Sequence, residues 1–234
     1  MPFNLDKCKV MHVGSRNPKR TYNMNGRPLQ TVQEESDLGV TITNDLKPTK
    51  HCKLACKKAN VMLGFIARNF DYKTPEVMLT LYNSLVRPHL EYAVQFWSPN
   101  YRKDIELLER VQRRATKMIP SLRGQAYEER LKKLNLFSLE KRRLRGDLIQ
   151  VFKYLNRFNN VDHGNMLELH TNQRTRNNGR PLKEKRCHTD IGRRFFSNRV
   201  VRHWNKLPAE VVNAKTISTF KNRIDRHFIA TGIY

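Results

Sequence analysis

The chain has 234 residues, enough for one large domain or two small ones, and its 38% hydrophobic content argues against disorder of the whole chain. Its longest apolar stretch, Val61 to Ala67, is interrupted by Gly64 and is far shorter than the roughly 20 residues of a membrane-spanning helix, so no membrane is expected as a partner. Lys and Arg number 45 against 21 Asp and Glu, a net charge of +24, and a compact fold with that charge repels itself unless a polyanion neutralises it.

The opening residues lack a cationic start followed by an apolar segment, so we expect no secretory signal and an intracellular location, nuclear or cytoplasmic. Disulfides are then not expected. The four cysteines are Cys8, Cys52, Cys56 and Cys187. His51, Cys52 and Cys56 suggest a zinc site that Cys187-His188 completes, but structural zinc sites normally come as two tight ligand pairs and a second such pair is missing. The spacing favours ordinary thiols, and we predict no metal site.

Residues 1–47 are expected to form short strands. Lys9 to Val13 alternates in part, Asn25-Gly26 is a strong hairpin turn, and Leu38 to Thr43 is rich in β-branched residues. Two or three strands are too few for a stable sheet alone, so we expect them to pack on the helices or to be the end of a larger sheet.

Residues 48–158 have helical periodicity. Thr74-Pro75-Glu76 is a good helix start, Pro88 is a candidate kink, and Ser138 caps a long helix that runs to about Phe158. Further helices are predicted for Lys50 to Asn69 and Tyr127 to Leu134.

The clearest amphipathic helix is Tyr101 to Ile119. Its apolar residues recur at three- and four-residue spacing: Ile105, Leu108, Val111, Ala115 and Met118. Its cations lie away from that stripe: Arg110, Arg113, Arg114 and Lys117. One side can therefore be buried while the other presents four cations, either to solvent or to a partner. With the charge of the whole chain, this pattern favours nucleic acid as the partner.

Residues 159–188 have few large apolar side chains and many Asn, Arg and Gly, which predicts a linker or an arm. Residues 189–234 are expected to be helical again, with Phe195 and Trp204 on an apolar face and a last helix from Thr216 to Phe228. The fold class expected from these elements is mainly α with a small N-terminal β-hairpin or sheet remnant (α+β).

Catalytic constellations are not found in the sequence. It contains no phosphate-binding G-x-x-x-x-G-K-[ST] loop, no G-x-G-x-x-G and no H-E-x-x-H. The adjacent acid pairs, Glu34-Glu35 and Glu128-Glu129, do not resemble the converging carboxylates that hold two metal ions in phosphoryl transfer. We therefore predict no catalytic residues and no self-sufficient enzyme.

Contacts to a phosphate backbone are expected from basic side chains on three helices. These candidates are Arg110, Arg113, Arg114, Lys117, Arg142, Arg143, Arg145, Arg193 and Arg194. Such contacts give affinity and salt dependence but little sequence preference. Four aromatic residues among the cations are candidates for stacking on bases: Tyr101, Tyr127, Phe195 and Trp204. For Phe195 and Trp204 the apolar spacing favours core packing over stacking.

Two long stretches, LYNSLVRPHLEYAVQFWSP (Leu81 to Pro99) and LLERVQRRATKMIPSLRGQAYEERLKKLNLFSLEKRRLRGDLIQVFKYL (Leu107 to Leu155), carry a family resemblance. They resemble the region after the catalytic core of non-LTR (LINE-type) retrotransposon reverse transcriptases of the chicken-repeat and jockey kind. The tail RRFFSNRVVRHWNKLPAEVV (Arg193 to Val212) is similar to the C-terminal segment of the same polyproteins.

The resemblance implies roles for N-terminal residues and for the helices. Lys7 would lie near the phosphates of the incoming nucleotide, and Asp37, Leu38, Gly39 and Val40 would form the primer-grip hairpin. The helices would form a thumb-like bundle followed by C-terminal helices, and the partners would be RNA and DNA, as an RNA–DNA duplex or template-primer.

The sequence departs from the family pattern at the catalytic aspartates, because the aromatic-Ala-Asp-Asp turn of these polymerases is absent. The resemblance thus implies a C-terminal fragment of an RNA-directed DNA polymerase that binds template-primer but is inactive by itself. Mg²⁺ is then expected only in the full-length polymerase, and this chain needs no cofactor. The alternative is a stand-alone basic RNA- or DNA-binding module with a cellular role.

Overall fold

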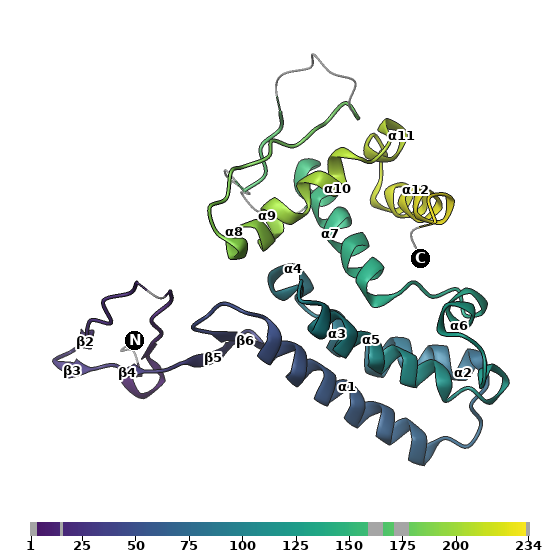
Figure 1. Cartoon of the computed structure of the whole chain (residues 1–234), viewed down its shortest axis with the longest axis horizontal. Coiled ribbons are helices and arrows are strands. Elements are labelled where there is room, and N and C mark those ends of the chain that lie inside the picture. The colour runs from purple at the N-terminus through teal and green to yellow at the C-terminus, as the bar shows by residue number, and fades with distance from the viewer. Residues whose placement is uncertain (1–3, 15, 159–165, 171–177, 233–234) are drawn as a thin grey trace.

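The computed structural model describes residues 4–14, 16–158, 166–170 and 178–232. It is mainly α-helical with a few short strands near the N-terminus, which confirms the predicted fold class. Two neighbouring groups of helices form the body, and the strands extend away from one end of it (Figure 1). None of the described helices is both long enough and apolar enough to cross a membrane.

The N-terminal strands pair in twos. A short 3-10 helix, Leu5–Lys7, comes before them. The pairs are β1 (Lys9–Val10) with β4 (Gln30–Thr31), parallel, and two antiparallel hairpins, β2 (Asn23–Met24) with β3 (Arg27–Pro28) and β5 (Glu34–Asp37) with β6 (Val40–Thr43). The predicted turn at Asn25-Gly26 is confirmed, and both residues have the positive φ that a tight two-residue turn requires, 51° and 76°.

The β5–β6 hairpin is fixed to the helices by contacts on both strands and at its turn. Its turn residues Leu38 and Gly39 also have positive φ, 47° and 79°. The hydroxyl of Tyr92 donates to the carbonyl of Leu38 at 3.0 Å, and Val40 is buried in the core beneath. The backbone N–H of Thr41 donates to Nδ1 of His51 at 3.1 Å, so the hairpin lies against the first turn of α1.

The first core forms around α1 (Thr49–Asn69) and α5 (Arg102–Lys117). The other elements packed here are α2 (Pro75–Leu81), the π-helical segment η2 (Tyr82–Val86), α3 (Arg87–Glu91), α4 (Val94–Trp97), the 3-10 turn η3 (Pro120–Leu122) and α6 (Tyr127–Lys133). As predicted, Thr74 caps α2, with its hydroxyl accepting from the Val77 N–H at 3.4 Å. The distortion expected at Pro88 is a π-turn just before it, because proline has no N–H and its ring crowds the preceding turn.

A polar network crosses the interior of this first group. Gln112, which is fully buried, accepts from the Tyr82 hydroxyl at 2.7 Å and donates to the Tyr127 hydroxyl at 3.0 Å. The Tyr127 hydroxyl in turn donates to the carboxylate of Glu109, which also accepts from the backbone N–H of Leu139 at 3.1 Å. These bonds satisfy buried polar groups and fix α5 against the start of α7.

The second core joins α7 (Leu139–Leu155) to the C-terminal helices. These are α8 (Asp190–Arg194), α9 (Phe196–Arg199), α10 (Val201–Asn205), α11 (Ala209–Val212) and α12 (Ile217–Ala230). Leu139 packs in the first core, whereas Leu148 and Phe152 pack in the second. The rings of Phe152 and Phe220 stack with centroids 4.3 Å apart. Helix α7 therefore contributes to both cores, and the second core includes residues from both the 48–158 and the 189–234 segments.

Part of the predicted linker packs into this second core. Leu167 and Leu182 are buried, and Leu169 and Leu182 form a β-bridge. Asn178 is buried as well, and its amide donates to the carbonyl of Trp204 at 2.8 Å. The prediction of a linker or arm is therefore wrong at Leu167, Asn178 and Leu182, which pack in the second core, whereas residues 183–188 are mostly exposed and form no helix or strand. Residues 159–165 and 171–177 lie outside the described part of the chain.

The cysteines of α1 are core residues. Cys52 and Cys56 are buried, and burial raises the pKa of their thiols to about 12 and about 11, so both are protonated at neutral pH. His51 beside them accepts a hydrogen bond through Nδ1 and packs on Trp97, with ring centroids 4.7 Å apart. Among the described residues, no group of three or more His, Cys, Asp and Glu side chains is placed to hold a metal ion.

The folded state should depend on a neutral His51. Burial, and secondarily the nearby charge of Lys58, lower the pKa of His51 below its ordinary value of 6.5. The unfolded chain then binds a proton at pH values where the folded chain does not, so the free energy of unfolding should fall as the pH decreases below about 6.5. In His51→Asn, whose side-chain oxygen can still accept from Thr41, urea unfolding between pH 7.5 and 5.5 should show a weaker decline. An equal decline in both proteins would contradict this role.

Candidate nucleic-acid interface

The four cations predicted on the basic helix are all exposed on α5. Leu108, Val111 and Ala115 face the first core, as their spacing predicts. The exposed cations on the other side are Arg110, Arg113, Arg114 and Lys117. The buried side of the helix also includes polar residues that periodicity had not marked, among them Glu109 and Gln112 of the interior network.

Helix α1 adds cations that the sequence analysis did not select. Its 21 residues contain no Asp or Glu. Lys53, Lys57 and Asn60 are four and three residues apart, so they share one face of the helix, and both lysines are exposed. The absence of acids over residues 49–69 is a signal in the sequence that could have identified this helix.

Helices α1 and α5 present these cations side by side. Arg110, Arg114 and Lys117 have the same four- and three-residue spacing on α5 as Lys53, Lys57 and Asn60 on α1. The two stripes meet where Nη1 of Arg114 donates to Oδ1 of Asn60 at 3.0 Å. A second bond near the start of both helices, from Thr49 Oγ1 to Asp104 Oδ2 at 2.6 Å, shows that they run in the same direction. We name Lys53, Lys57, Arg110, Arg114 and Lys117 the α1–α5 basic surface.

The cations of this surface form no ion pair within the part of the chain that the structure describes. None of its five cations lies within 4.0 Å of a carboxylate oxygen there. Glu106, an exposed acid on α5, pairs with Arg102 at 3.1 Å. The surface can therefore attract a polyanion without first breaking an internal ion pair.

Arg113 points toward α6 instead of α1. Its guanidinium lies over the ring of Tyr127, 4.5 Å from the ring centre, in a cation–π contact. The Tyr127 ring is buried and its hydroxyl belongs to the interior network, so this residue is not available to stack on a base. Arg113 remains exposed and lies at the edge of the basic surface.

The three arginines predicted on α7 do not face a partner. Arg142 forms two bonds to the carboxylate of Glu91 on α3, and Arg145 forms two to Asp225 on α12, at 2.5 and 2.8 Å. Arg143 is only 4% exposed, and its burial lowers the pKa of its guanidinium. This part of the prediction is wrong, because Arg142 and Arg145 join α7 to α3 and α12 and Arg143 is buried.

The remaining predicted residues lie apart from the α1–α5 basic surface. Arg193 is exposed and pairs with Asp190 at 3.3 Å, whereas Arg194 lies over the ring of Tyr101 at the start of α5. Tyr101 precedes Arg110 by nine residues, about 14 Å along the helix. Lys7 is exposed at the end of the 3-10 helix that precedes β1.

The residues predicted to form a primer-grip-like hairpin do form a hairpin turn. Asp37 and Val40 pair across the turn, and Leu38 is 83% exposed at its tip. The hairpin contacts His51, which is two residues from Lys53 and therefore on a different face of α1. The hairpin and the basic surface thus share one end of α1 without forming a continuous patch.

Comparisons with known proteins found no significant match to this chain among protein-family models, curated proteins or solved structures.

Proposed function

We propose that this chain binds nucleic acid through the α1–α5 basic surface, as the thumb-like C-terminal part of a non-LTR retrotransposon reverse transcriptase. The observation that carries the binding proposal is the pair of parallel cationic stripes, which no described carboxylate neutralises. The resemblance of residues 81–99, 107–155 and 193–212 to that polymerase family supports the identity of the partner as a template-primer duplex.

The chemistry of the surface fits a phosphate backbone. Lysine and arginine side chains on two adjacent helices can contact successive phosphates, and the contacts release counterions from the duplex. Such a surface binds without strong sequence preference, which suits a polymerase that must hold any template. An RNA–DNA duplex is accordingly the ligand with which we would test it.

Charge reversal on α1 tests the surface. Lys53→Glu/Lys57→Glu should weaken binding of a fluorescently labelled RNA–DNA duplex, and the slope of log affinity against log salt should become shallower by about two. Fluorescence anisotropy at several salt concentrations between about 50 and 200 mM measures both quantities. Both lysines are exposed and neither forms an ion pair with a described carboxylate, so circular dichroism should show an unchanged fold.

Lys215→Glu/Lys221→Glu is the matched control. These lysines are exposed at the start of α12, in the other group of helices, and the variant has the same change of net charge. Its salt slope should stay near that of the wild-type protein. Equal losses in the two variants would mean that only net charge matters and would overturn the assignment of the surface.

A competition experiment tests the identity of the partner. As a polymerase thumb, the chain should bind unrelated duplexes with similar affinity. If one structured RNA displaces the labelled duplex at a concentration at least a hundredfold lower than a generic duplex does, a stand-alone RNA-binding module is the better description.

A further inference from the structure

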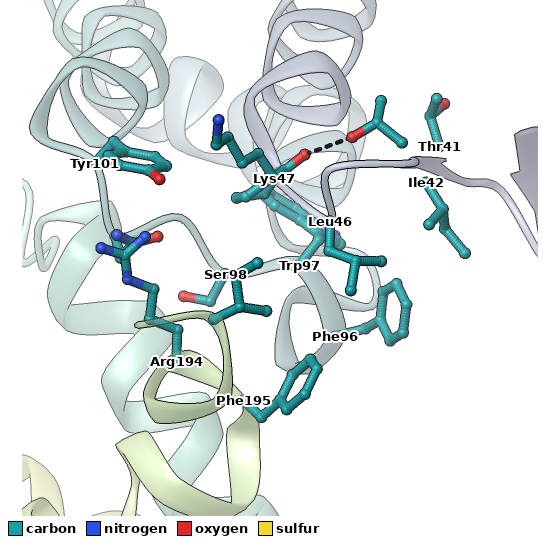
Figure 2. A pocket seen from close by; sticks show the side chains of 14 residues that line it. Thr41, Ile42, Leu46, Lys47, Phe96, Trp97, Ser98, Tyr101, Arg194 and Phe195 are labelled. Carbon is teal, nitrogen blue, oxygen red and sulfur yellow. Dashed lines mark hydrogen bonds between the residues drawn. The ribbon is translucent and has the colours of Figure 1, made fainter. Parts of the chain in front are cut away.

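A pocket of about 90 Å³ lies at the junction of the β5–β6 hairpin, the end of α4 and α8 (Figure 2). We call it the junction pocket. It is built from three segments far apart in the sequence: residues 41–48, residues 96–101, and Ile191, Arg194 and Phe195. It is separate from the α1–α5 basic surface, none of whose residues lines it.

Two aromatic rings on the apolar side of the pocket are open to solvent. Phe96 is 64% exposed and Phe195 is 53% exposed, and both lie on the same side of the pocket in Figure 2. The prediction that Phe195 packs in the core is wrong. Phe195 has the extended backbone (ψ 147°) that separates α8 from α9, and this break turns its ring toward the pocket. Leu46 and Ile42 complete the apolar side.

A fixed cation stands on the opposite side of the pocket. The guanidinium of Arg194 lies 4.7 Å from the ring centre of Tyr101, and with its amide oxygen turned toward Arg194, Asn100 accepts from Nε and Nη1 at 2.8 Å. Lys47 also lines the pocket, but its ammonium is paired with Asp45 at 3.3 Å. No Asp or Glu lines the pocket among the described residues, so Arg194 can face an anion.

We propose that the junction pocket binds an unpaired nucleotide of an RNA or DNA strand, with the base stacked on Phe96 and Phe195 and the phosphate near Arg194. Exposed aromatic rings beside a fixed cation suit this ligand, because every base has a planar apolar face and every nucleotide carries an anionic phosphate. This proposal rests on the proposed function, because nucleic acid is again the ligand. It adds a second site, which binds an unpaired nucleotide and not a base-paired one.

Abasic strands separate base stacking from backbone attraction. Wild-type protein should bind a 12-nucleotide oligothymidine about tenfold more tightly than a 12-nucleotide abasic strand of the same charge. Phe96→Ala/Phe195→Ala should lose this preference and keep its affinity for the RNA–DNA duplex. Tyr72→Ala is the matched control, since Tyr72 is an aromatic residue that is 85% exposed and does not line the pocket, and it should keep the preference.

A spectroscopic measurement gives an independent result. A strand that contains 2-aminopurine should lose fluorescence when its base stacks on wild-type protein, and the double phenylalanine variant should largely restore it. The proposal that the junction pocket binds a base would be overturned if wild-type protein bound natural and abasic strands equally. It would also be overturned if the double variant kept the preference. Duplex binding by Lys53→Glu/Lys57→Glu tests the α1–α5 basic surface, whereas the preference for a natural strand over an abasic strand tests the junction pocket. The two proposals can therefore fail separately.

Discussion

Replacing Trp204 by alanine is expected to lower the free energy of unfolding by about 3–5 kcal/mol, the usual cost of removing a large buried aromatic side chain. Trp204 is fully buried in the second core, and its ring stacks on Phe220 with centroids 6.0 Å apart. Its indole N–H also donates to the carbonyl of Arg180 at 2.9 Å, so the substitution leaves a partly buried acceptor without its partner.

Phe195→Ala is the natural control for Trp204→Ala, because the same segment supplies both aromatic residues. Phe195 is 53% exposed, so its removal should change stability by less than about 1 kcal/mol. Urea unfolding followed by circular dichroism measures both variants. Similar losses of stability would mean that the two rings are equally buried in solution and would contradict the packing of α8, α9 and α10.

Arg199→Ala should have an effect of comparable size for an electrostatic reason. Nε and Nη2 of Arg199 donate to the two oxygens of Asp147 at 2.9 and 3.0 Å, and the Asp147 side chain is only 5% exposed. Nη2 also donates to the carbonyl of Gln95 at 2.9 Å, so one guanidinium joins α9 to α7 and α4. Its removal breaks the direct ion pair of a buried carboxylate and leaves Arg143 as the nearest remaining guanidinium. Breaking a buried pair in this way costs about 3–5 kcal/mol.

Two further variants isolate the buried charge as the cause. Arg202→Ala removes an arginine whose side chain is 79% exposed and whose ion pair with Glu184 lies at the surface, so its effect should stay below about 1 kcal/mol. Arg199→Met/Asp147→Leu removes both charges and should be more stable than Arg199→Ala alone. If the double variant is less stable than Arg199→Ala, the unpaired carboxylate is not the main cause, and lost packing or the loss of the negative charge beside Arg143 is responsible.

Local features of this fold could be predicted because their causes lie within a few residues. Thr74 and Ser138 cap their helices as the sequence indicates, since a hydroxyl at that position meets the N–H three residues later. The Asn25-Gly26 turn follows from two residues that tolerate positive φ. The exposed cations of α5 follow from helical periodicity alone.

Sequence alone determined a strongly cationic, mainly helical chain, because charge and periodicity are properties of neighbouring residues. Only the tertiary structure decided which cations remain unpaired. Arg142 and Arg145 find carboxylates 51 and 80 residues away, whereas Lys53 and Lys57 meet none among the described residues. Such pairings depend on how helices pack, and a pattern read along the chain does not contain that information. The junction pocket has the same origin, because its aromatic rings and its cation come from segments that only folding brings together.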